Sequence, residues 1–476
     1  MKERIRSLII LVSLIISTAC AAYMMYARIP LLYETPIYDE LFSMATANPD
    51  FSFKTVWDTI LTQDVNLPLY NLILRVWAHI VPFTVPWLRV LSLLFSLVLV
   101  PLAWLAAPKQ WNNLKKGVLC LLLGGSIALS MFSAVMRAYS FGVLVCCVMS
   151  LLALRILENL KTKTPSSNLL FYGFFVLGLV CSYIHYFCAA LFFITALWLF
   201  INALLYKNQQ VRIFVTTALT FFLWIPWVVV TYLSLNNFQE DWWYEAPVAA
   251  ASGEIFALLL GTAPILCGTV CFITLGVISI LFNEKKRFSD FQDTWLGCFQ
   301  VGMLLVTVSL ISLRYNLWMD RYFLFVLPSL FIILTSILTH LTKRSPLFFL
   351  LLPLLLFCWT YHAWWYLHPR LEDLTGLSSA MEYVSKLPDV TDVLVAYDSI
   401  DYKGPSREFV TNYFVPKGSH IKLIPLTQDN QHRIHNHVPV IMPLCSMLNL
   451  MAYSNNYGFA LPPNLYAQNN TCVLVL

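Results

Sequence analysis

The sequence predicts an α-helical polytopic membrane protein with about eleven transmembrane helices, followed by a small α/β domain outside the membrane. Of the 476 residues, 59% are hydrophobic and only 12% are charged, and the mean hydropathy is +0.70. A soluble protein of this length would have to cover its surface with more polar side chains. Apolar stretches of about 20 residues recur along the chain, and each is long enough to cross a bilayer as a helix.

Eleven such stretches can be recognised. They cover residues 7–27, 88–107, 117–135, 138–157, 168–183, 186–205, 213–233, 254–282, 294–312, 322–340 and 346–362. The first could be a cleaved signal peptide, because basic residues precede it and small residues follow it. Its apolar stretch is long for that role, so we interpret it as an uncleaved membrane anchor.

Lys and Arg alternate between the loops and predict the orientation. They precede the first span and fill the even-numbered loops: Lys2, Arg4, Arg6, Lys109, Lys115, Lys116, Lys161, Lys163, Lys207, Arg212, Lys285, Lys286, Arg287, Lys343 and Arg344. Positive charge favours the cytoplasmic side, which predicts an N-terminus inside and a tail outside after about Tyr361. The net charge of +5 therefore reflects topology, and nucleic acid is not an expected partner. We expect a bacterial inner membrane, and we expect the functional residues to face the periplasm.

The chain is predicted to divide into a transmembrane domain at 1–363, with outer loops at 28–87 and 234–253, and an α/β domain at 364–476. Strand-like segments in the tail at 392–397, 420–425, 438–442 and 472–476 alternate with helical patches at 378–387, 406–414 and 446–453. Such alternation is typical of a small α/β layer. Cys445 and Cys472 both lie in this tail, where a disulfide and two free thiols remain open alternatives.

An acidic pair, Asp39 and Glu40, follows the first span. Two carboxylates beside a membrane must stay hydrated or paired. They could serve as favourable charges at a helix N-terminus, or they could have a chemical role.

A second group of charges opposes the inside-positive bias. Arg89, Arg137, Arg314 and Arg321 lie at the outer ends of spans. Each could extend to a lipid phosphate at the interface. Taken together they favour an anion site, because the planar guanidinium matches phosphate oxygens.

The acidic pair and two of the arginines belong to a set of short motifs along the chain. The motifs are Tyr38-Asp39-Glu40, then Asp64 with Pro68-Leu69-Tyr70, Arg137-Ala138-Tyr139, His185-Tyr186, and Arg321-Tyr322 before a proline-containing span. Over roughly residues 1–345 the set resembles the protein O-mannosyltransferase and aminoarabinose-transferase group of the GT-C superfamily. The resemblance implies a GT-C fold, and inverting transfer of a sugar from a polyprenyl-phosphate donor to an acceptor hydroxyl.

Within that resemblance each motif receives an expected role. Asp39 is the candidate base, and Glu40 orients the loop or binds the donor sugar. Arginines stabilise the leaving phosphate. The expected donor phosphate-binding residues are Arg89, Arg137, Tyr139, Arg321 and Tyr322, and the expected site-lining residues are Asp64, Asn66, Tyr70 and His185.

The chain departs from the family pattern at Asn66-Leu67-Pro68, where relatives carry His or Lys before two prolines. One branch of the family holds a metal with an acidic residue matching Asp64 and a distant His, but the loop at 234–252 contains no His. We therefore expect no tightly bound zinc and assign no metal ligand. Glu240, Asp241 or Glu245 could hold a weakly bound divalent cation.

Two other functions stay open. A lipid or solute transporter usually places ionisable groups near the bilayer midplane, whereas those of this chain lie at the ends of spans. A catalytically inactive scaffold is compatible with the departure at Asn66-Leu67. The expected acceptor is lipopolysaccharide, another glycan, a lipid or a protein. Membrane lipids are expected partners in every case.

Overall fold

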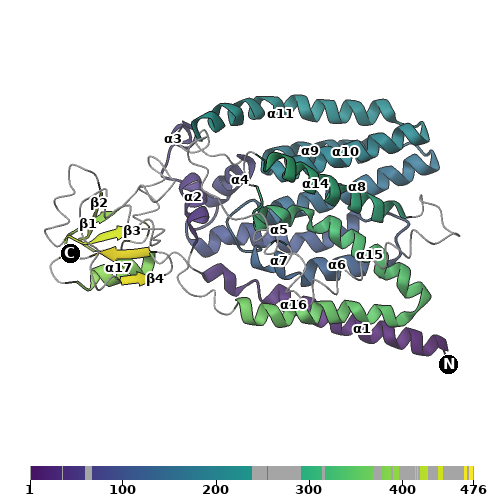
Figure 1. Cartoon of the computed structure of the whole chain (residues 1–476), viewed down its shortest axis with the longest axis horizontal. Helices are drawn as coiled ribbons and strands as arrows, with labels where there is room; N and C mark the ends of the chain where they lie inside the picture. Colours follow the sequence, from purple (N-terminus) through teal and green to yellow (C-terminus); the bar gives the residue numbers. More distant parts are fainter. Residues whose placement is uncertain are drawn as a thin grey trace. The chain divides into compact units, whose positions relative to one another are not determined.

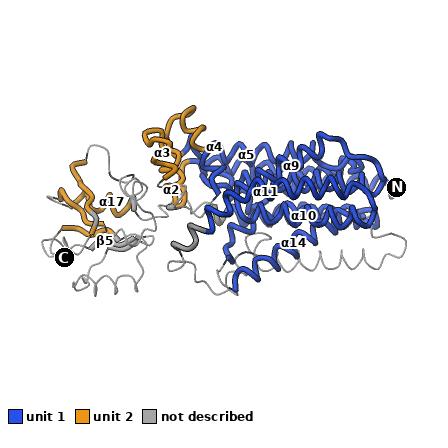
Figure 2. Tube along the Cα trace, turned by 90° about the horizontal axis from the view of Figure 1, so that it is seen from above, with its two compact units in different colours: residues 1–32, 64–73, 86–367 blue, residues 33–63, 74–85, 368–476 orange. Residues whose placement is uncertain are grey.

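The structure is a computed structural model, and it describes most of the chain. The described residues are 2–34, 36–58, 67–238, 255, 291–313, 317–367, 377–387, 390–395, 413, 415, 419–426, 438–442, 466–468 and 471–474. Two compact units comprise residues 1–32, 64–73 and 86–367, and residues 33–63, 74–85 and 368–476 (Figure 2). We call them unit 1 and unit 2 and describe each by itself. The domain boundary at 363 stays a prediction.

Unit 1 is a set of apolar helices (Figure 1). They are α1 (Lys2–Tyr26), α5 (Val85–Ala106), α6 (Asn113–Gly125), α7 (Ile127–Met131), α8 (Tyr139–Thr162), α9 (Asn168–Ile184), α10 (Tyr186–Tyr206), α11 (Gln210–Phe238), α14 (Gln292–Ile311), α15 (Leu327–Arg344) and α16 (Leu351–Leu367). The 3₁₀ helices η4 (Asp320–Val326) and η5 (Pro346–Leu350) lead into α15 and α16.

Eight helical segments of the described chain are long and apolar enough to cross a bilayer, and α9 is a shorter apolar helix. The chain is therefore a multi-pass membrane protein, as the composition predicts. The predicted span at 254–282 lies almost entirely outside the described residues. The total of eleven spans and the orientation in the membrane stay predictions.

The predicted span at 117–135 is not one continuous helix. It divides at Gly124-Gly125-Ser126 into α6 and α7. Ser126 has an extended backbone (φ −66°, ψ 127°), and its Oγ accepts a hydrogen bond of 3.3 Å from the Leu129 amide. Serine is a preferred N-cap because its hydroxyl satisfies an amide of the first turn. The helix therefore restarts at this serine, and the prediction of an unbroken span was wrong.

A buried amide connects four helices in the core of unit 1. Gln300 of α14 donates to Ser150 of α8 at 2.9 Å and to Thr195 of α10 at 2.7 Å, and it accepts from Ser329 of α15 at 2.8 Å. Lipid tails are as apolar as the helix surfaces, so membrane helices gain little from the hydrophobic effect on association, and hydrogen bonds of this kind orient them.

An ion pair joins the first turns of two helices. Lys115 of α6 pairs with the carboxylate of Asp293 of α14, and its ammonium lies 4.4 Å from the ring centre of Trp111. Both side chains are largely buried, so each charge depends on the other.

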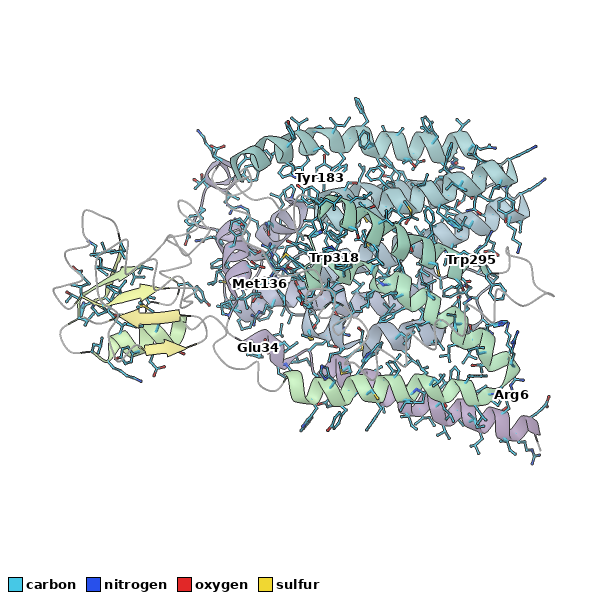
Figure 3. The ribbon with its side chains drawn as sticks, viewed as in Figure 1. Arg6, Glu34, Met136, Tyr183, Trp295 and Trp318 are labelled. Atoms are coloured by element: carbon cyan, nitrogen blue, oxygen red, sulfur yellow. The ribbon has the colours of Figure 1, made fainter. Side chains whose placement is uncertain are left out.

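Two tyrosines hold α11 on its neighbours. The Tyr183 hydroxyl donates to the Leu223 carbonyl at 2.7 Å, and the Tyr186 and Thr231 hydroxyls are 2.5 Å apart. Figure 3 shows Tyr183 next to α11. Pro226 lies between these two contacts. Only 17% of the 18-residue apolar stretch of α11 is buried, so most of this helix is exposed on its outer side.

Unit 2 contains a five-stranded sheet in the order β2-β1-β3-β5-β4. The strands are β1 (Asp392–Val395), β2 (Lys422–Pro425), β3 (Val440–Met442), β4 (Tyr466–Gln468) and β5 (Thr471–Leu474). β1 runs parallel to β2 and β3, and β5 runs antiparallel to β3 and β4.

Helix α17 (Leu377–Ser385) covers this sheet and completes a small core. Ala380, Met381 and Val384 pack with Val393, Ile441 and Val473. The predicted α/β layer is confirmed, with β4 as an additional strand. The helical patches expected at 446–453 and over most of 406–414, and the side chains of both tail cysteines, lie outside the described residues.

Candidate functional site

The acidic pair occupies the first turn of α2 (Tyr38–Ala47) in unit 2. Glu40 is buried, and its Oε2 accepts a hydrogen bond of 3.1 Å from the Ile37 amide just before the helix. A carboxylate at this position satisfies an amide that has no partner within the helix. Glu40 therefore has a structural role at the helix start. Asp39 lies in the same turn and is half-buried.

Arg75 of α4 (Leu69–Ala78) holds the other end of α2. Its Nη1 donates to the carbonyls of Thr46 and Asn48 at 3.2 and 2.8 Å, and its Nη2 donates to the carbonyl of Phe51 at 2.5 Å. These carbonyls belong to the end of the helix and the turn after it, where a cation is favourable. Hydrogen bonds thus hold both ends of the helix that carries Asp39.

A small cavity in unit 1 contains four of the predicted site residues. It is lined by Leu67, Tyr70, Asn71, Arg137, Ala138, Tyr139, Ile184 and His185. These residues come from the start of α4, the segment before α8 and the turn between α9 and α10. The structure thus brings Tyr70, Arg137, Tyr139 and His185 together around one cavity, and their roles in a site stay a prediction.

His185 is a neutral hydrogen-bond donor in this cavity. It caps the start of α10, and its Nδ1 accepts from the Phe187 amide at 3.2 Å. Burial, then the nearby charges of Arg137 and Arg321, lower the pKa of His185 to about 3. With Nδ1 acting as an acceptor, the proton of the neutral ring lies on Nε2.

Aromatic rings fix the position of His185. Its ring centre lies 4.9 Å from that of Tyr322 and 4.6 Å from that of Phe325, and Phe325 also contacts Tyr139 with ring centres 6.4 Å apart. This packing needs a glycine at position 142 of α8. A Cβ on Gly142 would lie 2.3 Å from Cε1 of Phe325.

Asn71 is a cavity residue that the sequence did not reveal. The residue is only 4% exposed, and it lines the cavity beside Tyr70. It offers both donors and an acceptor. Nothing in the motif distinguishes it from other residues after Tyr70.

Arg89 and Arg321 lie outside the cavity lining. Arg89 is buried, and its Nη1 donates to the carbonyls of Leu31 and Leu32 at 2.8 and 3.4 Å. The Arg321 guanidinium lies 5.9 Å from the ring centre of Tyr322, close enough for its charge to act on His185. Asp64, Asn66 and Arg314 lie outside the described residues.

The described residues do not fit a resident metal. No group of three His, Cys, Asp or Glu side chains among them could hold an ion. The acidic residues at 240, 241 and 245 are not described. We therefore assign no reaction step to a metal.

The described cavity lining suits an anion. It contains one permanent cation, several neutral donors and no carboxylate. Such a lining favours phosphate and stabilises charge that develops on it.

The apolar helices of unit 1 and the small sheet of unit 2 together define a class, a multi-pass membrane protein with a small α/β domain. Among solved structures, the chain is similar in fold to ArnT from Cupriavidus metallidurans. The apo structure matches with a TM-score of 0.55 at 10% identity, over 96% of this chain and 97% of that chain. The structure bound to undecaprenyl phosphate matches with a TM-score of 0.56 at 11% identity, over the same shares.

The likeness lies in the fold rather than in the sequence. No family model matches the chain, and a search of curated proteins gave no significant match.

Proposed function

We propose that the chain is a membrane glycosyltransferase that moves a sugar from a polyprenyl-phosphate donor to an acceptor hydroxyl at the outer face of a bacterial inner membrane. The observation that carries the proposal is the cavity lined by Tyr70, Asn71, Arg137, Tyr139 and His185. The ArnT structure bound to undecaprenyl phosphate supports a prenyl phosphate as the ligand class. The acceptor is a glycan, a lipid or a protein.

The reaction is a single displacement at the anomeric carbon. The acceptor oxygen forms a bond to that carbon while the bond from carbon to the phosphate oxygen breaks, and the electron pair stays on the phosphate. The acceptor proton passes to Asp39, which we assign as the general base. The phosphate thereby changes from a diester with one negative charge to a monoester with up to two.

The cavity residues stabilise the additional negative charge on the leaving phosphate. Arg137 and the Nε2–H of His185 donate to the phosphate oxygens, and Tyr139 adds a hydroxyl. Arg321 lies beside Tyr322, outside the cavity lining, and its positive charge acts on the phosphate from there. Donors fixed in place before the reaction stabilise the developing charge without rearranging.

The remaining residues position the substrates. Asn71 has an amide available for a sugar hydroxyl, and Tyr70 is held by a hydrogen bond of 2.7 Å between its hydroxyl and that of Ser92. Arg89 anchors Leu31 and Leu32, and Glu40 stabilises the first turn that carries Asp39. Asp64 and Asn66 remain expected neighbours of the donor.

The test uses the purified full chain in detergent with polyprenyl-phosphate sugars and candidate acceptors. We expect Asp39→Asn to lower transfer by about 100-fold or more, the range of general-base catalysis, while long-chain prenyl phosphate still binds. Arg137→Met should weaken that binding. Asp50→Asn, an exposed residue of the same unit, and Arg4→Met, exposed in α1, are the matched controls.

Transfer that survives Asp39→Asn unchanged would contradict the assignment of the base. If the chain binds prenyl phosphate but transfers no sugar, an inactive scaffold is favoured. Movement of the lipid between leaflets without transfer would favour a transporter.

A further inference from the structure

Arg28, just beyond α1, is a buried cation that the proposed reaction does not use. Its side chain is fully buried. Nε donates to Ser130 Oγ at 3.2 Å and Nη1 to Ser96 Oγ at 2.5 Å, while Nη2 donates to the carbonyls of Gly124 at 2.9 Å and Leu123 at 3.5 Å. All these partners are neutral, and no carboxylate of the described chain pairs with it.

A charge in this environment is costly. An arginine keeps its charge in a protein, and a cation inside a membrane domain is normally paired or functional. An apolar side chain of similar length would avoid the desolvation cost. The hydrogen bonds of Arg28 must therefore achieve something that apolar packing cannot.

Those bonds converge on the break between α6 and α7. Leu123 and Gly124 belong to the last turn of α6, where carbonyls have no partner further along the helix and the helix dipole favours a cation. The end of α6 packs directly on its neighbours. A Cβ on Gly124 or Gly125 would lie 3.7 Å from atoms of Ala21 in α1, an ordinary contact, whereas a Cβ on Gly125 would lie 2.5 Å from Cδ2 of Leu356 in α16. Arg28 thus caps α6 from the neighbouring helix.

The same guanidinium also holds the segment that leads to the cavity. Ser130 belongs to α7, and the Ser133 hydroxyl donates to its carbonyl at 2.7 Å. Ser140, after the cavity residues, donates to the Phe132 carbonyl at 3.0 Å. Between Ser133 and Ser140 lies Arg137. The hydrogen bonds from Arg28 therefore fix the start of the short loop whose far end binds the anion.

We propose that Arg28 is a positioning residue that fixes the α6–α7 break and, through Ser130, the place of Arg137 in the cavity. The inference rests on the proposed function, because it gives Arg137 its phosphate-binding role. Arg28 itself touches neither donor nor acceptor.

The experiment compares Arg28→Met and Arg28→Lys with Ser13→Ala in the purified full chain. Ser13 is a buried serine of α1 whose hydroxyl has no partner in the part of the chain that the structure describes, so its loss should change nothing. Arg28→Met removes the charge and the hydrogen bonds, and Arg28→Lys keeps the charge without the planar fork that reaches four acceptors. Each variant is measured for thermal unfolding, binding of long-chain prenyl phosphate, and KM against kcat.

A fourth measurement reports position without any reaction. A cysteine introduced by Ala138→Cys, in the cavity wall, is labelled with a water-soluble maleimide. The rate is compared with and without Arg28→Met, after subtraction of labelling at the native cysteines.

We expect Arg28→Met to stay folded, to bind prenyl phosphate at least 10-fold more weakly, and to change the labelling rate at position 138. Arg28→Lys should give a smaller loss of binding. Unchanged binding and labelling in a folded Arg28→Met would overturn the inference and leave the proposed function intact. Binding that falls only in proportion to the unfolded fraction would overturn it too, since the role would then be purely structural. Should the wild type neither transfer nor bind, the proposed function fails, and the labelling rate alone decides whether Arg28 positions the segment.

Discussion

Gly142 offers a direct test of how the cavity is supported. The change is Gly142→Ala, which adds one methyl group to α8. That methyl would lie 2.3 Å from Cε1 and 2.8 Å from Cδ1 of Phe325, and 2.9 Å from Sγ of Cys188. Carbon atoms in contact are normally about 3.5–4.0 Å apart. The ring of Phe325 must therefore move by about 1 Å or more.

Both stability and binding should respond. Overpacking of a core costs about 1–3 kcal/mol. Because the ring of Phe325 packs against His185 and contacts Tyr139, its movement shifts two cavity residues. A misplacement of about 1 Å in a site costs on the order of 100-fold in rate. We expect transfer to fall by a factor of that order and prenyl-phosphate binding to weaken.

The matched control is Gly302→Ala, the same substitution in the middle of α14. A Cβ on Gly302 would meet no atom within 4 Å. Both variants gain the same helix propensity, about 1 kcal/mol, so the difference between them isolates the clash. Thermal unfolding in detergent should separate them by about 2 kcal/mol. Equal stability and equal binding in the two variants would refute the packing argument.

Three further changes test other parts of unit 1. Gln300→Leu should lower the free energy of unfolding by about 2 kcal/mol, since it removes three interhelical hydrogen bonds of roughly 0.6 kcal/mol each; a change below about 0.5 kcal/mol in detergent unfolding would contradict this. Lys115→Met leaves the buried carboxylate of Asp293 without its cation and should cost about 3 kcal/mol, with Lys115→Met/Asp293→Asn recovering part of it in the same assay. For His185, whose pKa is lowered to about 3, the unfolded chain takes up a proton near pH 6.5 and the folded chain only near pH 3. The free energy of unfolding should therefore fall as the pH falls through this range, by at most about 1.4 kcal/mol per pH unit. His185→Phe should remove that dependence on pH. An identical pH profile of stability in both proteins would count against the buried neutral ring.

The membrane class and most spans could be predicted because a helix that crosses hydrocarbon must be apolar along about 20 consecutive residues. Apolar length alone located α1, α5, α8, α10 and α15 to within a few residues. The break at Ser126 escaped this reasoning, since hydropathy averages over the Gly-Gly-Ser sequence. The local signal was present, but its meaning depends on a guanidinium about 100 residues earlier in the chain.

Part of the cavity lining could be anticipated from the sequence motifs. The motifs contain Tyr70, Arg137, Tyr139 and His185, and these four line one cavity. Asn71 belongs to no motif, and only its buried place in the cavity lining distinguishes it. Arg89 shares its residue type and its place at a span end with Arg137, yet its donors go to the backbone of Leu31 and Leu32. Charge at a span end does not reveal which acceptor it meets.

The attachment of α11 has a consequence for lipids. Most of this helix faces away from the rest of unit 1, and in hydrocarbon an apolar surface gains little by leaving the lipid. Its rotation about its own axis is therefore set by polar contacts. Near its start Arg212 donates to the Ser166 carbonyl at 2.9 Å and to Asn168 at 2.8 Å, and further along two phenols reach Leu223 and Thr231, positions about 12 Å apart along the helix. Replacing both tyrosines with phenylalanine would leave the second half of α11 without these two hydrogen bonds, and acyl chains could then enter between this half and its neighbours α9 and α10.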